Sequence, residues 1–196
     1  PETLVVFNHP LWDEAGIGAA AHFELFQGFL GRYGAWLHAL ELNGLRPWAE
    51  NRRVMRAAAG SGHPLVAGGD RHGCEPNANL NLTNAGSFDE FAAEVRKDRI
   101  SDVLFLPQYR EPLKLRYLES VRDVLRDYPE YPGRVRWLDR FFYRSETGAE
   151  VPASVLFRDN GLGVVRHFLG LSGLLDRRHV RSAIRSALAD GQEVAP

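Results

Sequence analysis

Short apolar runs alternate with stretches of helical periodicity along the first 127 residues, and this alternation constrains the fold more than any other feature. The apolar runs predict strands at residues 4–8, 39–42, 64–68, 79–83 and 102–107. Helices are predicted between them, within residues 14–38, 49–59, 87–97 and 111–127. Repeated strand–helix units favour an α/β fold with a parallel sheet or barrel, in which the chemistry lies at the carboxyl ends of the strands.

Two of the predicted strands end in residues that are typical metal ligands. Strand 64–68 leads to Asp70 and His72, whose spacing places both side chains on one face of an extended chain. Strand 4–8 leads to His9. A carboxylate and two imidazoles suit a divalent metal such as zinc, manganese or iron, and three protein ligands with an open position are typical of a catalytic centre. The alternative is three ordinary capping or core residues, because an isolated D-x-H pattern is common by chance.

These segments resemble motifs of the PHP (polymerase and histidinol phosphatase) superfamily. Asn8-His9-Pro10 is similar to its HP motif, and Gly68-Gly-Asp-Arg-His-Gly73 to its G-S-D-x-H motif. Between them, Ala39-Leu-Glu-Leu-Asn-Gly44 is similar to the family's E-x-x-N-G segment. The resemblance covers roughly residues 4–100. It implies a distorted, TIM-barrel-like (β/α)7 fold with a centre of two or three metal ions, and a phosphoesterase that hydrolyses a small-molecule phosphate ester with metal-activated water.

The chain departs from the family pattern in two ways. Gly69 replaces the family's serine, and no H-x-H motif occurs anywhere in the 196 residues. We therefore interpret residues 1–127 as the C-terminal part of a PHP-like barrel, which a missing N-terminal segment or a partner chain is expected to complete. The parent protein is then expected to be a metal-dependent hydrolase and this chain alone to be inactive. The alternatives are a non-catalytic PHP-like scaffold that has lost its metal centre and a polymerase-associated PHP domain acting on DNA ends.

Two polar residues of the strand at 39–42 and its end are candidates for the same site. Asn43 is predicted to bind substrate, the alternative being a turn residue before Gly44. Glu41 lies two residues earlier on the same strand face. It is expected either to reach the site or to pair with an arginine such as Arg46.

Two arginines are candidates for contact with the substrate phosphate. Arg71 lies between Asp70 and His72, so on a regular strand it points away from them. It reaches the site only if the chain bends, and otherwise forms an exterior salt bridge. Arg110 follows the strand at 102–107 and is a further candidate for anion contact.

Residues 128–196 are predicted to form a C-terminal extension that is mixed at first and then helical. Arg134 to Tyr143 is a candidate strand, and Leu162 to Ala189 has helical periodicity with several arginines. A basic amphipathic surface of this kind can bind a membrane or nucleic acid, but it is more often a solvated helix face.

Composition favours a cytoplasmic protein, and the small-molecule substrate is what the family resemblance implies. The net charge of −1 gives no general attraction to nucleic acid or to a membrane, so neither is an expected partner. The single cysteine, Cys74, excludes an intrachain disulfide and is consistent with a reducing compartment. No window approaches the roughly 20 apolar residues of a transmembrane helix.

Overall fold

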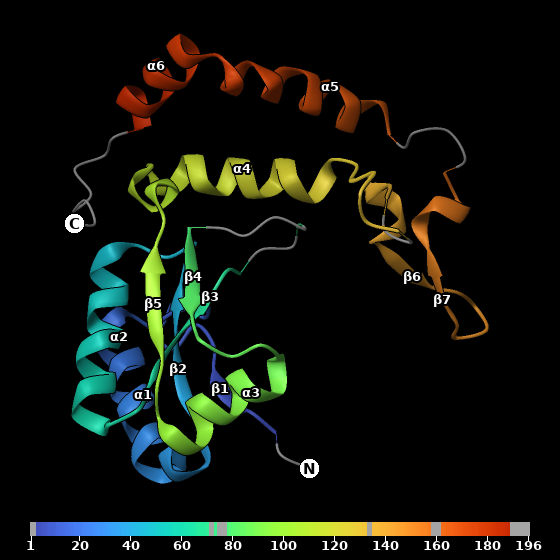
Figure 1. The fold of residues 1–196 in the computed structure, drawn as a ribbon. Helices are drawn as coiled ribbons and strands as arrows, with labels where there is room; N and C mark the ends of the chain where they lie inside the picture. Colours follow the sequence, from blue (N-terminus) through green and yellow to red (C-terminus); the bar gives the residue numbers. More distant parts are fainter. Residues whose placement is uncertain (1–2, 71–72, 74–77, 133–134, 158–161, 189–196) are drawn as a thin grey trace. The chain divides into compact units, whose positions relative to one another are not determined.

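The computed structural model describes residues 3–70, 73, 78–132, 135–157 and 162–188, and it divides into two compact units (Figure 1). The first unit holds the described residues up to Leu113 except Gly73, and the second holds Gly73 and the described residues from Lys114 onward. The fold is mixed α/β with small sheets, and these residues form no closed barrel. The predicted partial barrel therefore stays a prediction. No helix in the described part is both long and apolar enough to cross a membrane.

The first unit is built on a parallel three-stranded sheet in the order β1-β2-β3. Its strands are β1 (Val6–Phe7), β2 (Ala39–Asn43) and β3 (Leu65–Gly68). They are connected by α1 (Ala19–Tyr33), the short 3-10 helix η1 (Gly34–Trp36) and α2 (Trp48–Ser61). Phe7 lies opposite Leu40, and Asn43 opposite Gly68, so the carboxyl ends of neighbouring strands meet at one edge of the sheet. The first three predicted strands are thus confirmed, although β1 is shorter than expected.

The two faces of β2 have different neighbours. Leu40 and Leu42 pack into the core cluster that holds Phe26 of α1 and Val54 of α2. Ala39 packs instead in the cluster beneath α3 and η2, and Figure 1 shows α1 and α2 on one side of the sheet and α3 on the other. Because side chains alternate along a strand, Glu41 and Asn43 share the face of Ala39, away from α1 and α2.

The next two strands run antiparallel, so the predicted parallel sheet or barrel does not extend to this pair. Strand β4 (Asn79–Leu82) pairs with β5 (Asp102–Phe105). They are joined by α3 (Phe88–Ala93), whose N-cap Ser87 accepts the Glu90 N–H through its hydroxyl oxygen, and by the π-helical turn η2 (Glu94–Asp98). At Arg99 the backbone is left-handed, with φ of 56°, so that η2 ends at the point where the chain turns into β5. Apolar content predicted both strands correctly but carries no information about their direction.

A side-chain amide joins the antiparallel pair to the parallel sheet. The Asn81 carbonyl oxygen of β4 accepts a hydrogen bond from the Ala67 N–H of β3 at 2.7 Å, and its amide nitrogen donates to the Ala67 carbonyl at 3.2 Å. The amide of Asn79 donates to the Leu42 carbonyl at 2.6 Å. These contacts fix β4 beside the ends of β2 and β3.

The second unit corresponds to most of the predicted C-terminal extension together with α4 (Leu113–Leu125). The remaining elements are the 3-10 helix η4 (Trp137–Asp139), the antiparallel pair β6 (Phe142–Arg144) and β7 (Glu150–Pro152), η5 (Ala153–Val155), α5 (Gly163–Ser172), η6 (Gly173–Asp176) and α6 (Arg178–Leu188). Ion pairs of Arg122 with Asp176 and of Arg181 with Glu119 connect α4 to η6 and α6. The candidate strand at 134–143 is thus a short helix followed by a short strand, and the predicted C-terminal helix is two helices separated by η6.

Candidate functional site

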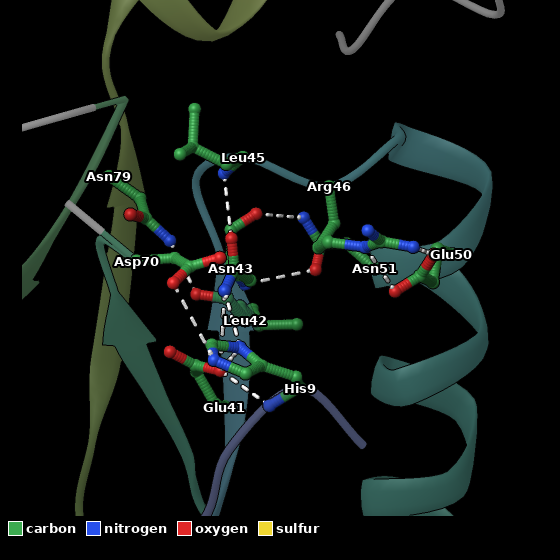
Figure 2. A network of polar contacts seen from close by, with 10 residues as sticks. All are labelled: His9, Glu41, Leu42, Asn43, Leu45, Arg46, Glu50, Asn51, Asp70 and Asn79. Atoms are coloured by element: carbon green, nitrogen blue, oxygen red, sulfur yellow. Dashed lines mark hydrogen bonds and ion pairs between the residues drawn. The ribbon is translucent and has the colours of Figure 1, made fainter. Parts of the chain in front are cut away.

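His9 and Asp70 meet at the carboxyl edge of the parallel sheet (Figure 2). Each lies two residues beyond the end of its strand, β1 for His9 and β3 for Asp70. Both have positive φ, 48° and 45°, a conformation that Arg99 alone shares among the described non-glycine residues. Histidine and aspartate tolerate this left-handed conformation better than most residues. The imidazole Nε2 of His9 lies 3.6 Å from Oδ1 of Asp70.

A second carboxylate contacts the other nitrogen of the same imidazole. Oε2 of Glu41 lies 2.8 Å from Nδ1 of His9 and also accepts the backbone N–H of His9 at 2.6 Å. The Glu41 side chain is only 6% exposed, against 26% for His9. Glu41 thus contacts the candidate site residue His9, as the first of its two sequence expectations states, and Arg46, named in the alternative, pairs with Glu50 at 2.8 Å. The imidazole is therefore held between a buried carboxylate and a more exposed one.

Asn43 extends this contact into a buried polar network. Its amide nitrogen lies 2.7 Å from Nδ1 of His9, and its carbonyl oxygen accepts the Leu45 N–H at 2.7 Å. Asn51 of α2 hydrogen-bonds the backbone N–H and carbonyl of Asn43 at 3.0 and 2.9 Å, and its amide also donates to the Tyr109 hydroxyl at 2.7 Å. Buried networks whose members are hydrogen-bonded hold their side chains rigidly. The network thus anchors the end of β2 beneath the candidate site.

Trp12 lies beside His9, a position that sequence reasoning missed. Its ring meets the imidazole edge-on, with 5.6 Å between ring centroids, and the guanidinium of Arg46 lies 5.5 Å from the Trp12 centroid. Trp12 reaches this place through a turn in which its N–H donates to the His9 carbonyl at 3.0 Å. The proline directly after His9 is the sequence signal for that turn. Trp12 remains 38% exposed, so it offers an apolar surface next to the imidazole.

The pair of His9 and Asp70 has the spacing of two ligands of one divalent ion. Ligand atoms about 2.0–2.2 Å from a tetrahedral ion lie roughly 3.4 Å from each other, close to the 3.6 Å between Nε2 and Oδ1. The nitrogen and oxygen donors also suit zinc, manganese or iron. Within the described residues no group of three or more His, Cys, Asp and Glu side chains is placed to hold a metal. The residues present thus fit two positions of a metal site.

The other predicted site residues differ in what the structure describes of them. His72 and Arg71 lie outside the described residues. Arg110 is exposed at the end of the 3-10 helix η3 (Pro107–Arg110), and the described structure records no contact between it and His9, Asn43 or Asp70. Of the two predicted substrate-binding residues that the structure describes, Asn43 touches His9. No family model, curated protein or solved structure matches the chain.

Proposed function

We propose that this chain supplies part of the metal centre of a PHP-type hydrolase, and that the reaction is phosphoester hydrolysis. The observation that carries the proposal is the 3.6 Å approach of His9 Nε2 to Asp70 Oδ1 at the carboxyl ends of parallel strands. These two donors come from strands that flank β2 in the sheet and are separated by 60 residues of sequence. Strand ends of this kind are where α/β folds place their chemistry.

Each residue has a distinct task in the proposed site. Nε2 of His9 and Oδ1 of Asp70 are two of the ligands, and His72 is proposed as a third. A divalent ion held there supplies positive charge for phosphate oxygens and activates water near neutral pH. Asn43, Arg71 and Arg110 are proposed to bind the substrate. Trp12 adds an apolar wall beside His9.

We also propose that β1, β2 and β3, with α1 and α2, are part of a distorted (β/α)7 barrel of PHP type. Three parallel strands in chain order, with both connecting helices on one face, are consistent with a barrel segment. The near-neutral charge favours a small phosphate ester over nucleic acid, and the single cysteine favours the cytoplasm.

Metal titration of the purified chain tests the proposal. Calorimetry with Mn²⁺ or Zn²⁺ should show weak, saturable binding, which Asp70→Asn and His9→Gln each reduce at least tenfold. Asp102→Asn is the matched control, because Asp102 is an exposed carboxylate at the start of β5 outside the site. Weak binding is expected because these 196 residues lack the H-x-H ligands of the family, and affinity depends on the full ligand set.

Activity measurements complete the test. The chain alone should hydrolyse a generic aryl phosphate slowly or not at all with added metal, whereas a longer parent protein should be active and lose activity with Asp70→Asn. Equal metal affinity in Asp70→Asn and the original chain would contradict the proposal. The absence of any binding would favour the non-catalytic scaffold instead.

A further inference from the structure

We propose that Glu41 is a positioning residue that keeps the proton of the His9 imidazole on Nδ1, so that Nε2 is the nitrogen left open at the site. Glu41 does not reach the site as a ligand of its own in this arrangement. It acts through His9, which it holds by two contacts, one to the backbone N–H and one to Nδ1.

The carboxylate of Glu41 is well placed to fix the imidazole. One oxygen, Oε2, accepts the His9 backbone N–H at 2.6 Å and lies 2.8 Å from Nδ1. Both contacts have the short distances of charge-assisted hydrogen bonds. Because the side chain is buried, it has little freedom to leave this position. The ring is therefore oriented from two sides, by its own backbone and by its Nδ1.

The contact of Asn43 with Nδ1 allows the opposite assignment, in which Nδ1 accepts a hydrogen bond from the Asn43 amide instead of donating one to Glu41. The other contacts of Asn43 bear on this choice. The carbonyl oxygen of Asn43 is committed to the Leu45 N–H, so the group 2.7 Å from Nδ1 is the amide nitrogen, which is a donor. If Nδ1 accepted that donor, its lone pair would also face the Glu41 oxygen at 2.8 Å, which is repulsive. If Nδ1 carries the proton, it donates to Glu41 and the Asn43 amide donates to the same Oε2 at 3.4 Å, at the cost of two N–H donors that lie 2.7 Å apart. The second pattern satisfies the carboxylate and is favoured because bonds to an ionised acceptor are the stronger ones.

The neighbouring strand makes room for this arrangement. An ideal Cβ at Gly68 of β3 would overlap the Glu41 carboxylate and its Cγ. The Glu41 side chain thus crosses the backbone of β3 at Gly68, and glycine is the one residue type that leaves space for it because it has no Cβ. Gly68 is part of the G-G-D-R-H-G segment and pairs with Asn43 in the sheet. The positioning contact therefore depends on residues from β2 and β3 together.

The consequence concerns how His9 binds a metal. A ligand histidine commonly donates its second ring N–H to a carboxylate, which fixes its tautomer, and loss of such a partner lowers metal affinity about 10–100-fold. This consequence rests on the proposed function, whereas the tautomer itself is a property of the metal-free protein. The two are therefore tested separately.

The tautomer is read by NMR on the ¹⁵N-histidine-labelled, metal-free chain at pH 8. Long-range ¹H–¹⁵N spectra should show Nδ1 of His9 protonated and Nε2 unprotonated, with the signals assigned by their loss in His9→Gln. Glu41→Gln should weaken this preference, so that the two nitrogens move toward averaged shifts. Glu50→Gln is the control, since Glu50 pairs with Arg46 and does not touch His9. It should leave the His9 spectrum unchanged.

The same samples are then titrated with Zn²⁺. The proposal predicts that Glu41→Gln binds zinc about 10–100-fold more weakly than the original chain, while Glu50→Gln binds it equally. A metal-free His9 with its proton on Nε2, or protonated on both nitrogens, would overturn the proposal whatever the metal result. A Nδ1-protonated His9 in a chain that binds no zinc would leave the positioning role standing and would count against the proposed function alone.

Discussion

Gly68→Ala should displace Glu41 and release His9, although it adds only one methyl group. An ideal Cβ at this position lies 1.6 Å from Oε1 of Glu41, whereas real Cβ atoms keep at least 3.0 Å from their neighbours. The carboxyl group must therefore withdraw by at least 1.4 Å, the difference of the two distances. A shift of that size breaks the contacts of Oε2 with His9, which measure 2.6 and 2.8 Å. Overpacking typically costs about 1–3 kcal/mol and a hydrogen bond to a charged group about 1.5–3 kcal/mol, so we expect a loss of about 2.5–6 kcal/mol.

Thermal and urea unfolding of the purified chain measure this loss. For a chain of this length the expected decrease in Tm is roughly 5–24 °C. Gly60→Ala is the matched control, because a Cβ at Gly60 meets nothing within 4 Å and alanine is favoured in a helix. In the double variant with Glu41→Ala, Gly68→Ala should cost much less, because the clashing side chain is gone. An unchanged Tm together with an unchanged His9 spectrum in Gly68→Ala would refute the reasoning.

Two further predictions concern other parts of the first unit. The pKa of His38 is lowered by burial and by nearby Arg96 and Arg99, and its Nδ1 accepts the Val5 N–H at 2.9 Å, so the folded state favours neutral imidazole. The contribution of His38 to stability should be complete above about pH 6.5 and be lost as the pH falls through the lowered pKa of the folded state. Tm should therefore decrease as the pH falls over this range, and this decrease should be absent from His38→Gln. Strand β1 lies at an edge of the described sheet, so light scattering should show self-association that rises with concentration and decreases in Val5→Lys. A stable monomer with a cooperative melt at all concentrations would contradict the incomplete-barrel interpretation.

The sequence pattern was sufficient to predict that the candidate site residues lie at the ends of strands. An apolar run followed by turn residues predicts the end of a strand. The positions of His9, Asn43 and Asp70 at the ends of β1, β2 and β3 therefore followed from the pattern alone. The approach of His9 to Asp70 required the parallel pairing of β1 and β3 with β2, which the alternation of strands and helices indicated. Whether these residues bind metal stays a prediction.

Other features depend on contacts that local sequence does not encode. The two-residue alternation of side chains along a strand placed Glu41 on the correct face. That Glu41 contacts His9 and not an arginine depends on the space above Gly68. The position of Trp12 depends on the turn after His9. Because Trp12 lies outside any helical or strand pattern, periodicity does not predict where its side chain points. The antiparallel direction of β5 is decided by how α3 and η2 turn the chain, which apolar periodicity cannot report.

The side-chain amide of Asn81 has a consequence for intermolecular strand pairing at β3. By accepting from the N–H of Ala67 and donating to its carbonyl, it occupies both backbone groups of the residue before the last of β3. A foreign strand that approached this edge would find those two groups already bonded, and would have to displace a side chain before it could begin a ladder. Replacing Asn81 with leucine would leave a strand-forming residue that fits the local pattern, and the N–H and carbonyl of Ala67 would lose these two partners. The single amide thus blocks strand pairing at Ala67, where the antiparallel pair lies against the parallel sheet.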